Sequence, residues 1–182
     1  YRIKALWDQL AIDTLQSSLP VGRDYVGRDS LLALGCPRDG LKQTHGTHTA
    51  GIAAGSGAEG ADTLSPYRGI AWESDICLVC NATTDDIALI NPDDYYKYTY
   101  ALDALGFKYI FDYADRVGKP CVINFSEGSR QDFQGYDVLY YEMFDSLVGA
   151  EQIIDSSAGN DGQAINYLHK APSQQSAGLF CG

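Results

Sequence analysis

Two histidines and an asparagine are the first side chains whose types and spacing point to chemistry. His45 and His48 lie three residues apart, so on a helix both would face the same side. A zinc-binding helix would also need a glutamate between or near them, and none is present, so we expect no metal there. Asn160 lies in the Gly-Asn-Asp-Gly sequence of residues 159–162, which is typical of a turn. Its amide would equally serve as a hydrogen-bond donor to a developing negative charge.

A histidine that acts as a base needs a carboxylate on its other ring nitrogen, and two aspartates near the amino terminus are considered for this role. Residues 2–7 alternate weakly between polar and apolar side chains, which predicts a short strand, and Asp8 lies at its end. Sites of parallel sheets gather at the carboxyl ends of the strands, which favours Asp8. Asp13 has too little apolar sequence before it to end a strand. It stays open as the alternative.

The elements that must position these residues follow from periodicity. Residues 9–44 are expected to be irregular, apart from a short helix at 30–34 that Asp29 caps. The small residues of 44–55 recur at helical spacing and predict a helix packed closely on all sides, followed by a loop to residue 69.

Strands and helices then alternate, which predicts parallel βαβ units in an α/β layered fold. Strands are expected at 75–82, 121–126 and 152–157. Asp93 or Asp94 would cap a long helix that Gly118 ends. The apolar stripe of this helix is Phe107, Ile110, Ala114 and Val117, and that of a second helix, closed by Gly149, is Tyr140, Met143, Phe144 and Leu147.

Composition excludes several classes of protein. The chain has 182 residues with 13 Lys+Arg against 24 Asp+Glu, a formal net charge of −11. This balance argues against nucleic acid or an anionic membrane as the main partner, and no apolar run is long enough for a membrane span. The five cysteines are odd in number and widely spaced, so they do not form a disulfide framework. Cys77 and Cys80 lie in a predicted strand and face opposite sides, so we expect neither metal nor redox use of this pair.

Several segments, taken in order, resemble the subtilisin-like serine peptidases (subtilases). Residues 45–55 are similar to the histidine motif of that family, with Thr49 where valine is commoner. Residues 69–71 resemble its Gly-Val-Ala-Pro segment, with Trp72 in place of proline. Residues 122–128 resemble its substrate-binding strand, and residues 157–162 resemble its oxyanion segment. The similarity extends over nearly all of residues 1–162.

The resemblance implies a three-layer α/β fold with a mostly parallel central sheet and a Ser-His-Asp triad. His45 would be the general base, Asp8 its carboxylate and Asn160 an oxyanion donor. Residues 12–14 also resemble the family's Ile-Asp-Thr-Gly, which keeps Asp13 open, although Leu15 stands where glycine is usual. Asp39 matches an acidic position of many members, which we assign to substrate binding or structure. The expected substrate-binding residues are Ser126, Glu127, Gly128, Ser157, Ala158 and Gly159.

Glu127 departs from the family, which usually has an apolar residue at this position. A carboxylate beside a substrate pocket would favour a basic residue in the peptide, and the alternative is a solvated side chain.

The nucleophile motif of the family, Gly-Thr-Ser-Met-Ala, is not found in the sequence. We therefore expect residues 1–182 to be one incomplete domain, the amino-terminal part of a serine endopeptidase that binds a peptide or protein substrate, with apolar surface left uncovered. A second chain or a cleaved carboxyl-terminal part could supply the serine. The alternative is a non-catalytic binding or scaffold protein.

No cofactor is expected to be required, although the resemblance allows calcium. The acidic pairs at 85–86 and 93–94 are expected to be loop and cap residues. The resemblance also implies secretion or a cell-surface location.

Overall fold

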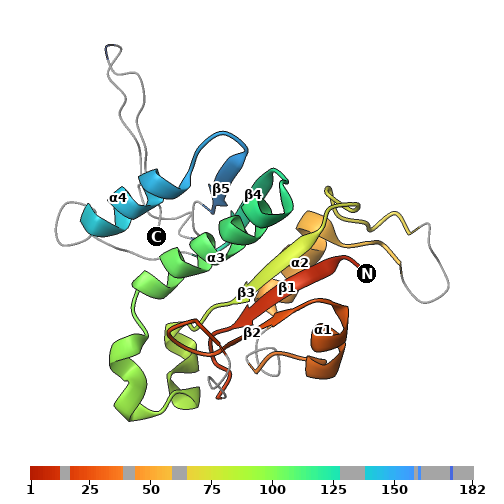
Figure 1. Cartoon of the computed structure of the whole chain (residues 1–182). Coiled ribbons are helices and arrows are strands. Elements are labelled where there is room, and N and C mark those ends of the chain that lie inside the picture. The colour runs from red at the N-terminus through yellow and green to blue at the C-terminus, as the bar shows by residue number, and fades with distance from the viewer. Residues whose placement is uncertain are drawn as a thin grey trace.

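The strands of the chain form two small sheets with helices on both sides (Figure 1). The computed structural model describes residues 1–12, 17–38, 44–58, 65–127 and 138–157, together with residues 160 and 173. Within these ranges the mixed α/β architecture agrees with the predicted fold class.

The first sheet has the order β2-β1-β3. Its central strand, β1 (Ile3–Asp8), runs parallel to β3 (Ile76–Cys80) and antiparallel to β2 (Arg23–Val26). The second sheet consists of β4 (Cys121–Phe125) and β5 (Gln152–Ser156), which are parallel and in register. The parallel pairs confirm the expectation of βαβ connections.

Helix α3 (Ala101–Val117) packs on both sheets and so joins them. Near the start of α3, Leu102 belongs to a core cluster with Trp7 and Val21. Further along the helix, Phe107 and Phe111 pack on Ile123 in a second cluster. Helix α4 (Val138–Leu147) adds the side chains of Phe144 and Leu147 to this second cluster, as its stripe predicted.

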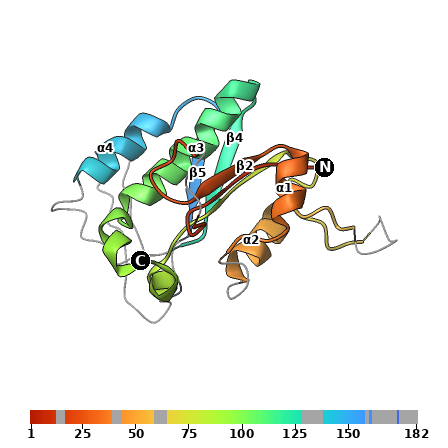
Figure 2. The same cartoon turned by 60° about the horizontal axis from the view of Figure 1, so that its bottom comes forward.

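Figure 2 shows α3 and α4 on one side of the strands, and α1 (Arg28–Leu34) and α2 (His45–Ala54) on the other. The sheet of β4 and β5 is covered only on the α3 side among the described residues: Ile123 is buried there, while Val122 and Ile153, which are partners in the register, are 68% and 56% exposed. This exposed pair agrees with the expectation of uncovered apolar surface.

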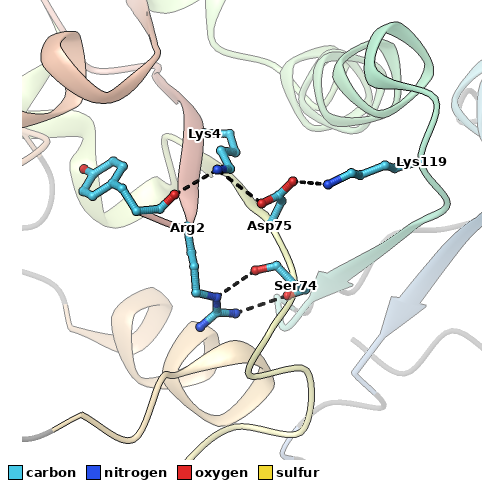
Figure 3. Close-up of polar contacts among 6 residues, drawn as sticks. Arg2, Lys4, Ser74, Asp75 and Lys119 are labelled. Atoms are coloured by element: carbon cyan, nitrogen blue, oxygen red, sulfur yellow. Dashed lines mark hydrogen bonds and ion pairs between the residues drawn. The ribbon is translucent and has the colours of Figure 1, made fainter. Parts of the chain in front are cut away.

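Polar side chains hold the amino ends of the strands together (Figure 3). Asp75, just before β3, forms ion pairs with Lys4 of β1 and with Lys119, which precedes β4. The guanidinium of Arg2 donates to the carbonyl oxygens of Ser74 and of Ala54, at the end of α2. These contacts link both sheets and α2 at the edge opposite to the strands' carboxyl ends.

Some local expectations are wrong. Asp29 does not cap α1, because the helix begins at Arg28, two residues earlier than predicted, and Asp29 lies in its first turn. Asp93 and Asp94 do not cap α3 either. Asn91 caps a separate 3₁₀ helix, η3 (Pro92–Lys97), and α3 begins only after Tyr100.

On α3 the predicted stripe is right except at its end, because Val117 is 42% exposed in the last turn. Gly118 ends the helix in the left-handed conformation, as expected (φ 65°, ψ 42°). Strand β2 lies in the segment that was expected to be irregular, and pairing with β1 supplies the order that its short sequence does not predict.

The expectation that α2 is enclosed on all sides is also wrong, since none of its residues is buried. Its small side chains instead permit a close backbone approach on one side. A Cβ atom added to Gly69 would lie 2.5 Å from the nitrogen of Gly55 and 2.8 Å from the oxygen of Gly51. The loop after residue 69 bonds to the helix end through its backbone, with Ala71 N–H donating to Ala53.

None of the described helices is both long and apolar enough to cross a membrane. The described cysteines form no disulfide. Cys77 lies inside β3, where burial raises the pKa of its thiol to about 12. This favours the interpretation of Cys77 as a small apolar residue, because the reactive form of a cysteine is the thiolate.

Candidate active site

The carboxyl ends of the strands bring several of the predicted site residues to one edge of the molecule. Asp8 is the last residue of β1, and Asn81 directly follows β3. Ser126 and Glu127 follow β4, and Ser157 follows β5. This is the edge at which parallel α/β sheets place their sites.

Asp8 is a rigidly held carboxylate. It is 1% exposed, and both of its oxygens accept backbone hydrogen bonds. Oδ1 accepts from the N–H of Leu10 at 3.0 Å and Oδ2 from the N–H of Arg38 at 2.8 Å. Such bonds fix the orientation of the side chain and satisfy polar oxygens that have been removed from water.

Two neighbours that the sequence analysis did not single out fix the position of Asp8. Gln9 is fully buried: its side-chain oxygen accepts from Ala82 N–H at 2.9 Å, and its Nε2 donates to the carbonyl of Leu102 at 3.3 Å. Gln9 thereby connects the end of β1 to the segment after β3 and to α3. Arg38 donates from Nη1 to Leu10 O at 2.9 Å and so closes the loop around the carboxylate. The only sequence signal for Gln9 is its place directly after Asp8.

His45 is the first residue of α2 and is exposed. Its Nε2 lies 3.0 Å from the carbonyl oxygen of Ser126, so the helix start meets the end of β4. Because a carbonyl oxygen only accepts, Nε2 carries the proton in this contact. His48, one turn further on, is also exposed.

Among the described residues no hydrogen bond joins Asp8 to His45, although a triad requires one between the carboxylate and Nδ1. A carboxylate oxygen has two acceptor positions, so the bonds from Leu10 and Arg38 leave capacity on Asp8 for a third donor. The two predicted residues lie on the same edge, but they are not in bonding contact.

Glu127 is bonded to Asn81, whose Nδ2 donates to Oε2 of the carboxylate. This bond bridges the carboxyl ends of β3 and β4, which are not paired as strands. The pKa of Glu127 is raised, chiefly by burial and to a smaller extent by the charge of Asp86. The bond from Asn81 and the nearby imidazole of His45 act in the opposite direction. Burial, and then the charge of Glu127, raise the pKa of Asp103 on α3 to about 7.

The other predicted site residues are described only in part. Ser157 N–H donates to Phe125 O at 3.1 Å and so continues the pairing of β4 with β5. Asn160 is an exposed residue in a bend. Gly128, Ala158 and Gly159 lie outside the described residues, as do Asp13 and Asp39.

The acidic pairs have structural partners. Asp86 accepts from the backbone and the hydroxyl of Thr83 at the start of η2 (Thr84–Leu89), and Asp94 forms an ion pair with Lys97. Within the described ranges no three His, Cys, Asp or Glu side chains are grouped in a way that would hold a metal ion.

Comparison with known proteins gives a similarity of fold. No family model matches the chain, and no curated protein matches it. Among solved structures, the CspB protease of Clostridium perfringens is similar, with a TM-score of 0.60 and 22% sequence identity. The similarity covers 88% of this chain and 31% of the CspB chain. The chain therefore shares its fold with under a third of the length of that protease.

Proposed function

We propose that this chain is the amino-terminal part of a serine endopeptidase of the subtilisin-like family. The observation that carries the proposal is the meeting of His45 with the carbonyl of Ser126, at the same edge as the buried carboxylate of Asp8. The fold shared with the CspB protease supports it, and so do the motifs around these residues in the sequence.

In the proposed mechanism His45 removes the proton of a serine hydroxyl and later returns it to the leaving amine. The present contact must first open, because Nε2 holds its own proton against Ser126 O. Once the ring leaves Ser126 O, loss of the Nε2 proton to solvent and uptake of a proton at Nδ1 would make Nε2 the base and give Nδ1–H to Asp8 as a donor. Asp8 then keeps the imidazole in that tautomer and stabilises the imidazolium.

Asn160 takes the role of a donor to the oxyanion of the tetrahedral intermediate, and the segment around Ser126 takes that of the strand along which the peptide lies. The nucleophilic serine comes from polypeptide other than residues 1–182, either a continuation of the same chain or a second chain. The proposed chemistry requires no cofactor. Secretion or display at the cell surface belongs to the same proposal.

A non-catalytic binding protein is the second candidate, and the contact geometry is the observation in its favour. Both oxygens of Asp8 and Nε2 of His45 are engaged with backbone groups rather than with each other. Under this alternative the contacts persist and no serine is activated.

The test uses the complete translation product of the gene that encodes this chain. We expect it to be labelled by a fluorophosphonate and to hydrolyse a casein substrate. His45→Ala should abolish both, because it removes the base that the proposed mechanism needs to take the proton of the serine hydroxyl. Asp8→Asn should lower kcat by about 10⁴-fold and Asn160→Ala by about 10²–10³-fold.

The matched control is His48→Ala, which removes an exposed imidazole from the same helix. It should retain labelling and hydrolysis. Absence of labelling in the wild-type product, or equal activity of the His45 and His48 variants, would contradict the peptidase proposal, and the first result would favour the binding protein.

A further inference from the structure

Glu127 lies one residue beyond the point at which His45 meets β4. The carbonyl of Ser126, its neighbour in the chain, is the group that contacts Nε2 of His45. The imidazole of His45 lies close enough to lower the pKa of Glu127. An extended chain advances about 3.3 Å per residue, so Glu127 faces a peptide residue within a few positions of the bond on which His45 acts.

The carboxylate of Glu127 is held in place rather than free in solvent. The side chain is half-buried, and Oε2 accepts from Nδ2 of Asn81. Among the described residues no donor reaches the second oxygen, Oε1. An amide that fixes one oxygen and leaves the other available orients the carboxylate toward an incoming donor.

No lysine or arginine of the described residues forms an ion pair with Glu127. None of the ion pairs that Lys4, Lys97, Lys108 and Lys119 form involves Glu127. The charge of Asp86 raises the pKa of Glu127 and the imidazole of His45 lowers it, while the charge of Glu127 raises the pKa of the neighbouring Asp103. A half-buried carboxylate with such neighbours gains more from a bound cation than a solvated one does.

We propose that Glu127, oriented by Asn81, is a specificity-determining residue that binds the lysine or arginine side chain of a peptide lying along residues 125–127. This inference rests on the proposed peptidase function, because it places the peptide beside His45. A guanidinium or ammonium group donates to Oε1, while the Asn81 bond to Oε2 is retained. The aliphatic part of the basic side chain lies along the half-buried surface.

The test measures binding, so it needs no nucleophile and uses the 182-residue chain. The probes are six hexapeptides of alanine and glycine with one arginine, which occupies a different position in each, and the same set with leucine in place of arginine. All arginine peptides have the same net charge, so attraction to the net charge of −11 affects them equally. Affinities come from NMR titration of the ¹⁵N-labelled chain.

We expect one arginine position to bind about 10-fold more tightly than the other positions and than leucine at that position, as for a charge-assisted hydrogen bond. Glu127→Gln should remove this preference. Its amide oxygen still accepts from Asn81, so the variant retains the fold. The matched control is Asp112→Asn, which removes one negative charge from the exposed surface of α3 and should retain the preference.

Equal affinity for every arginine position, or a preference that survives in Glu127→Gln, would overturn the inference while leaving peptide binding intact. Failure of every peptide to bind would overturn it as well. The fluorophosphonate test of the complete product does not depend on Glu127, so the fate of the peptidase proposal is decided separately.

Discussion

At the scale of single residues, Gly22 is as important to the site as the charged side chains. It has a positive φ of 64°, and a Cβ atom there would lie 2.0 Å from the backbone oxygen of Asp8 and 2.7 Å from the Cα of Gln9. Both obstacles are backbone, so neither can turn aside as a flexible side chain would. The position of Asp8 therefore requires a residue without a side chain fourteen positions later in the sequence.

We predict that Gly22→Ala destabilises the protein by about 2–4 kcal/mol, because the strain of a positive φ adds to the displacement of the β1 end. Urea unfolding followed by circular dichroism measures this. Gly27→Ala is the matched control: Gly27 also has a positive φ, 85°, but nothing lies within 4 Å of its added Cβ. It should cost only about 1 kcal/mol. Equal losses for the two variants would show that the close approach to Asp8 does not matter.

At the scale of elements, α3 determines how the two sheets meet, and its packing also lowers stability by burying a carboxyl group. Its apolar residues fill both core clusters, and it lies close to β3, since a Cβ atom added to Gly106 would be 3.3 Å from Cγ1 of Val79. The same packing buries Asp103 near Glu127. Burial, more than that charge, raises the pKa of Asp103 to about 7 from 3.8.

A raised carboxyl pKa means that the folded state binds the proton more tightly than the unfolded chain. Ionisation of Asp103 therefore destabilises the folded state. This effect is absent below about pH 4, grows as the pH rises from 4 to 7, and is complete above pH 7. We predict that Asp103→Asn raises the free energy of unfolding by about 1–3 kcal/mol at pH 8 and leaves it nearly unchanged at pH 3.5. Urea titrations at the two pH values measure the difference.

Asp112→Asn serves as the control on the same helix, since Asp112 is exposed and bonded to Lys108. Its loss should change stability by only about 0.3–0.5 kcal/mol. A gain at pH 8 that is no larger for Asp103→Asn than for Asp112→Asn would refute the assigned cost of burial.

At the scale of the whole molecule, the described surface retains an uncovered face. Val122 and Ile153 are exposed on the side of β4 and β5 that is turned away from α3, and α2 has no buried residue. In a doubly covered α/β sheet both of these surfaces would be packed.

For the isolated 182-residue chain we predict no peptidase activity and no labelling by a fluorophosphonate. The group that lies against His45 Nε2 is a carbonyl oxygen, and the hydroxyl of Ser126 accepts from Asn124 instead of contacting the imidazole. Mass spectrometry of the treated chain measures the label, with a known serine peptidase as the positive control. Stoichiometric labelling of the chain would contradict the proposal that the nucleophile lies elsewhere.

The sequence by itself determined the order and type of most elements. Continuous apolar runs predicted β3, β4 and β5, and helical stripes predicted the inner faces of α3 and α4, because these patterns depend on the local geometry of the chain. Motif resemblance also indicated Asp8 and His45 as candidates and marked Glu127 as unusual. Boundaries fared worse where capping is decided by single hydrogen bonds, as with Asn91 in place of Asp93 or Asp94.

Only the tertiary structure decided which groups meet at the site. The Asn81–Glu127 bond, the amide bridges of Gln9 and the contact of His45 with Ser126 join residues 46 to 93 positions apart. Strand β2 exists because β1 offers it a partner, and α2 is exposed because the described neighbours cover only one side of it. No local pattern encodes such contacts, since they depend on where the strands end in space and on which backbone groups those ends leave to be satisfied.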